Sequence, residues 1–374
     1  MAVYAHINTV PNGSTGGVMM KEHKELLAAG EESYVFWGRG RAGECDHELR
    51  FATDAEVKLD ALRTRLDGKA GFHSRAATKR LLERLDEIKP DVVHLHNLHG
   101  YYVNVEMLFE WLAARECCVE WTLHDCWAFT GHCAHFTYVK CAQWKSHCAY
   151  AKPCPQLDTY PKTYSKASCS WNFEQKKHFF NLVSVERMKL ITPSQWLSNL
   201  VGESYLSRYT VEVRHNTIDT SVFKPTPSDF RERHGIGERF MILGVASPWT
   251  ERKGLGDFAR LADKLDGDKY AIVLVGLSEK QIQQMPEGII GLARTDSCEE
   301  LAGIYTAADV FFNPTREDNY PTVNLEAEAC GTSVVTYDTG GCRETVRRGD
   351  SVVVPGHFED GLAQMLACHE RMRR

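Results

Sequence analysis

Apolar and polar positions along this chain predict a repeated alternation of strands and helices. Short apolar runs indicate buried strands of parallel sheets, and stretches with helical spacing separate them. The runs lie at residues 2–7, 33–37, 91–95, 119–123 and 189–192 in the first half, and at 240–245, 270–275, 310–312 and 333–336 in the second. We therefore expect an α/β protein with two Rossmann-like domains, whose parallel sheets face each other across a cleft.

The segment VRHNTIDTSVFKPTPSD is rich in Pro, Thr and Asp, and it predicts a linker between the two sets. We place the N-terminal domain at residues 1–212 and the C-terminal domain at 213–356. A helix at about 357–374 is expected to pack back on the N-terminal domain. The length of 374 residues suits two domains that each have a core.

Composition narrows the class of function. The net charge of −6 argues against a general nucleic-acid binder. The opening residues MAVYAHINTV run straight into polar Asn12 and lack the pattern of a signal peptide. No apolar run reaches the ~18 residues that span a bilayer. We expect a cytoplasmic protein.

The most specific pattern in the chain is ADVFFNPTREDNYPTVNLEAEACGTSVVTYDTGGCRE. A strand leads into an acidic loop, and a helix follows that Pro321 can begin, because its missing N–H costs nothing there. The free N–H groups of Thr322 and Val323 then face the end of the strand, where the helix dipole favours a phosphate. Glu326, one turn into the helix, is placed for a ribose diol, and Asp318 lies in the loop above.

Two other turns offer N–H groups or positive charge at strand ends. Gly16 and Gly17 precede a helix expected from about residue 18, where the backbone can approach a phosphate closely; a tight turn without a ligand is the alternative. Arg252 and Lys253 stand before a glycine and could neutralise a diphosphate leaving group. A solvated basic turn is the alternative for this pair.

Histidines gather at the ends of two strands. His124 and Asp125 end one strand, where a histidine can hydrogen-bond a hydroxyl group or carry a proton; a structural cap is the alternative. His94 and His96 point to the same side of another strand, and His99 follows. They could ligate a metal, but the run holds no carboxylate, so we favour a role in lining the acceptor side of the cleft.

Thirteen cysteines is a high count, and six of them lie between residues 126 and 169. Cys133, Cys141, Cys148 and Cys154 could bind a structural zinc ion that pins a long loop. No Cys-x-x-Cys pair occurs, and free or redox-variable thiols are the alternative.

Residues 58–84 hold eight basic side chains against three acidic ones, and Leu59, Leu62 and Leu66 recur there at helical spacing. This segment could rest peripherally on an anionic membrane surface, or it could be a solvated helical face.

Together these motifs resemble the retaining glycosyltransferases of family 4, which are group 1 glycosyltransferases with the two-domain GT-B fold. The resemblance covers nearly the whole chain. The family usually has two glutamates separated by seven residues; Glu326 matches the second, and Asp318 takes the place of the first. Many members carry an Arg where this chain has Ser247. The run HDCWAFTGHC with its trailing cysteines looks like the branch that builds capsular and colanic-acid-type polysaccharides.

The resemblance implies that a hexose moves, with retained configuration and without a catalytic metal, from a UDP- or GDP-linked sugar to a saccharide or polyprenyl-linked saccharide. It implies an acceptor-side N-terminal domain and a C-terminal domain that binds the nucleotide sugar. By resemblance His124, Asp318 and Lys253 are catalytic. The implied donor-binding residues are Gly16, Gly17, Arg252, Lys253, Glu317, Asp318, Tyr320, Thr322, Val323 and Glu326, and the implied acceptor-side residues are His96, His99 and Asp125.

Two other classes of function stay open. Ser247 and Asp318, which depart from the family pattern, suit a nucleotide-sugar-binding protein without transferase turnover. The cysteines of residues 126–154 suit a metal-binding scaffold.

Overall fold

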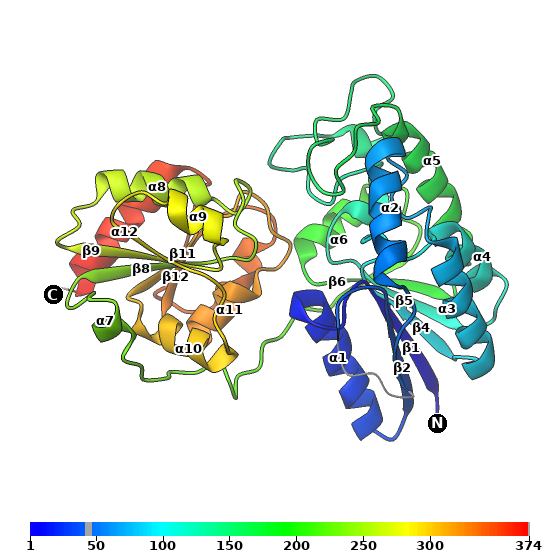
Figure 1. Cartoon of the computed structure of the whole chain (residues 1–374), viewed down its shortest axis with the longest axis horizontal. Coiled ribbons are helices and arrows are strands. Elements are labelled where there is room, and N and C mark those ends of the chain that lie inside the picture. Colours follow the sequence, from blue (N-terminus) through cyan, green and yellow to red (C-terminus); the bar gives the residue numbers. More distant parts are fainter. Residues whose placement is uncertain (42–46, 373–374) are drawn as a thin grey trace. The chain divides into compact units, whose positions relative to one another are not determined.

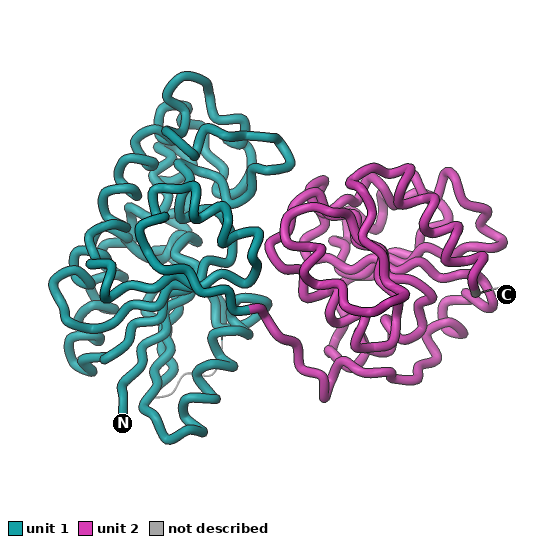
Figure 2. Tube along the Cα trace, turned by 180° about the vertical axis from the view of Figure 1, so that it is seen from behind, with its two compact units in different colours: residues 1–214 teal, residues 215–374 magenta. Residues whose placement is uncertain are grey.

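The chain folds into two compact units, residues 1–214 and 215–374 (Figure 2). The computed structural model describes residues 1–41 and 47–372. Each unit is a parallel sheet with helices on both faces (Figure 1), so the expectation of two Rossmann-like parallel sheets is confirmed. The division falls two residues after the expected boundary.

The N-terminal unit has a seven-stranded parallel sheet of order β3-β2-β1-β4-β5-β6-β7. Ala5 and Ile7 of β1 are fully buried with Leu81 of α3 and Leu108 of α4. His6, between them, points to the opposite face, which α1 covers (Figure 1). The elements are β1 (Val3–Asn8), α1 (Gly13–Ala28), β2 (Glu32–Trp37), β3 (Glu48–Arg50), α2 (Asp54–Asp67), α3 (Arg75–Ile88), β4 (Val92–Leu95), α4 (Val105–Ala113), β5 (Cys118–Thr122), α5 (Ser168–Phe179), β6 (Met188–Thr192), α6 (Gln195–Gly202) and β7 (Thr210–Val213).

Two helix boundaries in this unit differ from those expected from the sequence. The polar stretch 54–89 forms two helices, because α2 ends at Gly68 in the left-handed conformation (φ 74°) and α3 begins at Arg75. The first helix begins at Gly13 and not near residue 18, so Gly16 and Gly17 lie inside it.

The C-terminal unit has a six-stranded parallel sheet of order β10-β9-β8-β11-β12-β13. Helix α8 covers one face of this sheet, and α10 and α11 cover the other (Figure 1). Phe258 of α8 is buried in one core cluster, and Tyr305 of α10 and Ala327 of α11 are buried in another. The elements are α7 (Phe230–Arg233), β8 (Phe240–Val245), α8 (Leu255–Lys264), β9 (Tyr270–Val275), α9 (Glu279–Gln284), β10 (Ile289–Leu292), α10 (Cys298–Ala307), β11 (Val310–Asn313), α11 (Thr322–Ala329), β12 (Ser333–Tyr337), β13 (Val352–Val354) and α12 (Phe358–Met372).

The C-terminal helix α12 packs on the sheet of its own unit, which corrects the expectation that it returns to the N-terminal domain. Phe358, Met365 and Cys368 recur on one face of α12 and are buried beside Phe312 and Tyr337. These side chains cover sheet surface that would otherwise face water. None of the helices within residues 1–41 and 47–372 is both long enough and apolar enough to cross a membrane.

Candidate functional site

In the C-terminal unit, the turn that carries Arg252 and Lys253 is hydrogen-bonded to the acidic loop after β11. Strands β8 and β11 are parallel neighbours, so the turns at their carboxyl ends meet. The Arg252 carbonyl accepts a hydrogen bond from the Arg316 N–H at 2.6 Å, and the Arg252 guanidinium donates to the Glu317 carbonyl at 2.5 Å. Gly254 allows this approach, since a Cβ there would lie 2.3 Å from the Pro314 carbonyl oxygen.

Lys253 and Asp318 form the ion pair at this edge of the sheet. The Lys253 Nζ lies 2.5 Å from Asp318 Oδ2, and both side chains are mostly buried. The N–H of Gly341 donates to the Asp318 carbonyl at 2.9 Å. At Gly340 a Cβ would lie only 2.0 Å from that carbonyl oxygen. The Gly-Gly pair after β12 therefore packs directly on the loop that carries the acid.

Glu317 and Tyr320, which lie close to Asp318 in the sequence, have environments that differ from that of Asp318. Glu317 is fully buried, whereas the Asp318 carboxylate meets Lys253, so Asp318 is the acid paired with the cation. Tyr320 is 4% exposed, and its hydroxyl accepts a hydrogen bond from Arg347 at 3.1 Å. Its ring stacks on His215 with the ring centres 4.9 Å apart.

Helix α11 begins one residue later than predicted, because Pro321 is not its first helical residue. Pro321 is extended (φ −68°, ψ 105°) and caps the helix, and Thr322 is the first helical residue. The N–H groups of Thr322 and Val323 still belong to the first turn, whose donors have no partner within the helix. The helix is anchored by Asn324, whose amide accepts from Asn313 at 2.9 Å and donates to Thr345 at 2.8 Å.

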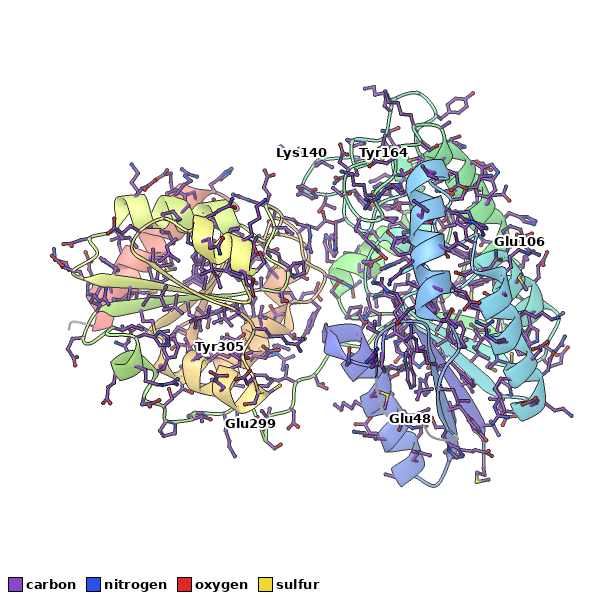
Figure 3. All side chains as sticks on the ribbon, in the orientation of Figure 1. Glu48, Glu106, Lys140, Tyr164, Glu299 and Tyr305 are labelled. Atoms are coloured by element: carbon purple, nitrogen blue, oxygen red, sulfur yellow. The ribbon has the colours of Figure 1, made fainter. Side chains whose placement is uncertain are left out.

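Glu326 is half-buried in α11 and is oriented by a tyrosine that the sequence analysis missed. Tyr305 lies on α10 (Figure 3), and its hydroxyl donates to Glu326 Oε2 at 3.0 Å. Burial raises the pKa of Glu326, and the hydrogen bonds from Tyr305 and Thr322 oppose this shift in part. A tyrosine on an apolar helix gives no local signal of this role, because the pair is 21 residues apart.

In the N-terminal unit, the two predicted glycines occupy different environments. A Cβ at Gly16 would lie 2.8 Å from the Val10 carbonyl oxygen, so this glycine lets α1 approach the preceding loop. Gly17 has open space around its Cα. Because α1 begins at Gly13, the unpaired N–H groups of its first turn lie N-terminal to the Gly-Gly pair.

The carboxyl ends of β4 and β5 bring the predicted acceptor-side residues together. His96, His99, His124 and Asp125 line one small pocket. Asp125 Oδ2 lies 2.7 Å from His99 Nε2 and its Oδ1 accepts from the Trp127 N–H at 2.8 Å. Burial alone would raise the pKa of Asp125, but His99 and these hydrogen bonds hold it well below its usual range.

His124 contacts His96 in this pocket. The His96 Nδ1 and His124 Nε2 atoms are 3.2 Å apart. Burial lowers the pKa of His124 to about 4, although the carboxylates of Asp125 and Glu22 oppose the shift. His124 is therefore a neutral imidazole near pH 7, able to accept a hydrogen bond or a proton.

The four predicted cysteines line a second cavity together with Cys169 of α5, which the sequence analysis left out. The thiols of Cys133 and Cys169 donate hydrogen bonds to the sulfur of Cys154, and this lowers the pKa of the Cys154 thiol. Burial raises the pKa of Cys148 to about 11. Cys169 lies 15 residues beyond Cys154 on a helix, and only the folded chain brings the two together.

Residues 239–368 match the protein family described as glycosyl transferases group 1. A putative colanic acid biosynthesis glycosyl transferase of Escherichia coli (strain K12) is 23% identical over 369 residues, which cover 91% of this chain and 84% of the relative. A D-inositol 3-phosphate glycosyltransferase of Corynebacterium jeikeium is 32% identical over 199 residues, covering 47% of each chain.

Solved structures are similar over the whole chain. Sucrose-phosphate synthase from Thermosynechococcus elongatus has a TM-score of 0.69 at 14% identity, covering 100% of this chain and 94% of that one. Anabaena Alr3699/HepE in complex with UDP-glucose has a TM-score of 0.64 at 14% identity, covering 100% and 91%. At these identities the likeness shows the fold.

Proposed function

We propose that this chain, a glycosyltransferase with the GT-B fold and a group 1 domain at residues 239–368, is a retaining enzyme acting on a nucleotide-diphosphate sugar. The donor is a UDP- or GDP-linked hexose, and the acceptor is a saccharide or polyprenyl-linked saccharide used in exported polysaccharide. The colanic acid relative and the complex of Anabaena Alr3699/HepE with UDP-glucose support this choice of substrates.

The observation that carries the proposal is the meeting of Lys253, Asp318 and the first turn of α11 at one edge of the C-terminal sheet. Lys253 forms an ion pair with Asp318. When the donor binds, the ammonium group turns to the diphosphate, beside the N–H groups of Thr322 and Val323, and the Asp318 carboxylate accepts hydrogen bonds from sugar hydroxyls. The carboxylate of Glu326, oriented by Tyr305, accepts from the ribose hydroxyls.

These groups stabilise the charge that develops on the leaving diphosphate, which a divalent ion does in other transferases. The bond between the anomeric carbon and the diphosphate oxygen breaks, and the acceptor oxygen bonds to the same face of that carbon. The acceptor's proton passes to the departing diphosphate. His124, as a neutral imidazole, forms a hydrogen bond with a sugar hydroxyl near the reacting carbon.

The proposal is tested by Lys253→Ala, with Lys264→Ala at the exposed end of α8 as a matched control. Loss of the cation should remove on the order of 2–4 kcal/mol of transition-state stabilisation, which lowers kcat/KM roughly 30- to 1,000-fold. The control should turn over like the wild type. Release of the nucleoside diphosphate is measured without added Mg²⁺ or Mn²⁺. Equal turnover by the two variants would contradict the role of Lys253.

A second candidate function is nucleotide-sugar binding without turnover. Ser247 is exposed where many family members carry an arginine, and Arg252 is engaged with the Glu317 carbonyl. If the wild type binds UDP or GDP tightly but releases no diphosphate with any donor and acceptor, and Lys253→Ala weakens only that binding, this second function holds.

We also propose that residues 58–84, which span much of α2 and α3, rest on an anionic membrane surface. Leu59, Leu62 and Leu66 of α2 are 46%, 55% and 64% exposed, and the segment holds eight basic side chains against three acidic ones. The protein should sediment with phosphatidylglycerol vesicles and less with phosphatidylcholine vesicles, and Leu62→Asp should weaken this binding. Equal sedimentation with both kinds of vesicle would refute an electrostatic contact.

For the cysteine cavity we propose a structural zinc ion. Its ligands would come from the predicted set of Cys133, Cys141, Cys148 and Cys154 together with Cys169. The purified Cys154→Ser variant should hold one equivalent of zinc fewer than the wild type, and its melting temperature should be lower. Metal-free, fully folded wild-type protein would exclude the ion.

A further inference from the structure

On the α1 face of the N-terminal sheet, four side chains of the types that bind metal ions converge. His6 comes from β1, His94 from β4, His96 from the residue after β4, and Glu22 from α1. One ligand atom of each lies within 4.8 Å of those of the other three. His6 and His94 are direct partners in the parallel pairing of β1 and β4, and strand alternation turns His96 to the same face.

The carboxylate of Glu22 is the centre of this His/Glu cluster. Its Oε2 atom is 3.1 Å from His94 Nδ1, 3.8 Å from His96 Nε2 and 4.0 Å from His6 Nδ1. The three imidazoles come from neighbouring positions of the sheet, and the carboxylate reaches them from a helix packed across it. Three nitrogens therefore face one oxygen from a single side.

Several of the polar atoms in the His/Glu cluster lack a hydrogen-bond partner. In the described part of the chain, both ring nitrogens of His6, the Nε2 of His96 and the Oε2 of Glu22 are buried without a hydrogen bond. His6 and His96 are each 1% exposed. A buried polar atom without a partner is costly, and several at one point indicate a group that satisfies them together.

The outward nitrogens of His94 and His96, in contrast, are held by neighbours. His94 Nε2 lies 2.8 Å from the Thr122 hydroxyl, and His96 Nδ1 lies 3.2 Å from His124 Nε2. Histidines that ligate a metal characteristically engage the second ring nitrogen in this way, which fixes the tautomer and the ring orientation. His94 and His96 thus direct their remaining nitrogens at Glu22.

We propose that His6, Glu22, His94 and His96 bind one divalent transition-metal ion, with zinc as the best fit. Three imidazole nitrogens and one carboxylate oxygen form a four-coordinate set that zinc accepts. Ligand atoms around tetrahedral zinc are about 3.4 Å apart at bond lengths of about 2.0–2.2 Å. The three nitrogens lie 3.1–4.0 Å from Glu22 Oε2, and all four ligand atoms lie within 4.8 Å of one another, so binding requires them to approach each other by up to about 1.4 Å.

The site is distinct from the cysteine cavity, and it lies in the unit that does not hold Lys253 and Asp318. The proposal therefore stands whether or not the transferase proposal does. A metal bound to His96 Nε2 leaves Nδ1 as that ring's proton donor, directed at His124. The expected role of the ion is structural, with His96 as a positioning residue for His124.

The test compares Glu22→Gln with Glu25→Gln in the full chain. Glu25 lies three residues on in the same helix, with its side chain 64% exposed. Elemental analysis of the purified proteins should find one equivalent of zinc fewer in Glu22→Gln than in the wild type and in Glu25→Gln. Titration of chelator-stripped protein with zinc should show affinity weakened by roughly 100-fold or more in Glu22→Gln.

Cobalt separates this site from the cysteines and covers the case in which Glu22→Gln fails to fold. The protein used is the Cys154→Ser variant, which keeps Glu22. One equivalent of Co²⁺ should give this variant the visible d–d bands of tetrahedral nitrogen and oxygen ligation, without a thiolate charge-transfer band. In ¹⁵N-histidine-labelled protein, zinc should produce a downfield imidazole N–H signal from His96. The proposal is overturned if Glu22→Gln retains as much metal as Glu25→Gln, or if the stripped Cys154→Ser protein takes up no Co²⁺.

Discussion

Gly340→Ala tests whether the Gly-Gly pair positions the acid of the donor site. Gly340 has φ 59°, a left-handed conformation in which an alanine costs about 1–2 kcal/mol. Its new Cβ would also lie 2.0 Å from the Asp318 carbonyl oxygen, whereas a relaxed contact is roughly 3.3 Å. The loop that carries Asp318 must therefore move by about 1.3 Å, and such overpacking costs a further 1–3 kcal/mol or so.

Gly237→Ala is the matched control. Gly237 has φ 57° in the same unit, and nothing lies within 4 Å of the position its Cβ would take. This variant has the same backbone penalty without the collision. The difference between the two unfolding free energies should thus be about 1–3 kcal/mol, which isolates the contact with Asp318.

The two variants are compared by urea unfolding and by steady-state release of the nucleoside diphosphate. A displacement of about 1 Å in a positioning group can lower turnover roughly 100-fold, so Gly340→Ala should lose most of its activity while Gly237→Ala keeps it. If the two variants unfold with the same free energy and turn over alike, Gly340 does not hold Asp318 in place and the site as described is wrong.

Two further predictions concern Glu326 and His124. Tyr305→Phe removes a hydrogen bond to a carboxylate and should weaken nucleotide binding by about 1.5 kcal/mol, roughly tenfold, in a calorimetric titration; unchanged affinity would mean that Tyr305 does not orient Glu326. His124 has a folded pKa of about 4 against 6.5 when unfolded, so the unfolded chain takes up the proton first as the pH falls. Up to about 3 kcal/mol of stability should be lost between pH 6.5 and 4, and His124→Asn should show a flatter melting temperature over this range; parallel curves for the two proteins would refute the shift.

The central strands and the helix after Pro321 were predictable because their signals are local. Apolar runs of strand length mark each central strand, and the sheets they form are confirmed. Thr322 and Val323 lie in the first turn of a helix, as expected from the proline before them. The family resemblance implied that Lys253 and Asp318 serve one site, but their ion pair was not predicted, because 65 residues separate them.

Helix ends were predicted less well, because they depend on contacts outside the helix. Gly16 lies within α1 where it packs on the loop before it, and no pattern of neighbouring residues shows this. The two helices in residues 54–89 are separated at Gly68, whose left-handed conformation the continuous polar pattern did not reveal. Helix α12 was predicted to pack on the N-terminal domain, but it packs on the sheet of its own unit. The apolar face of a helix does not identify the sheet that it covers.

The sequence by itself determined the fold class, the order of the strands along the chain and the segments that hold the candidate site residues, because each depends on residues within a few positions of one another. Only the tertiary structure decided which distant groups meet. A carboxylate was absent from the segment of His94 and His96, and Glu22 supplies it from a helix about 70 residues earlier in the chain. Parallel pairing of β1 with β4, and the packing of α1 on that face, bring these groups together, and these are non-local contacts that no local pattern encodes.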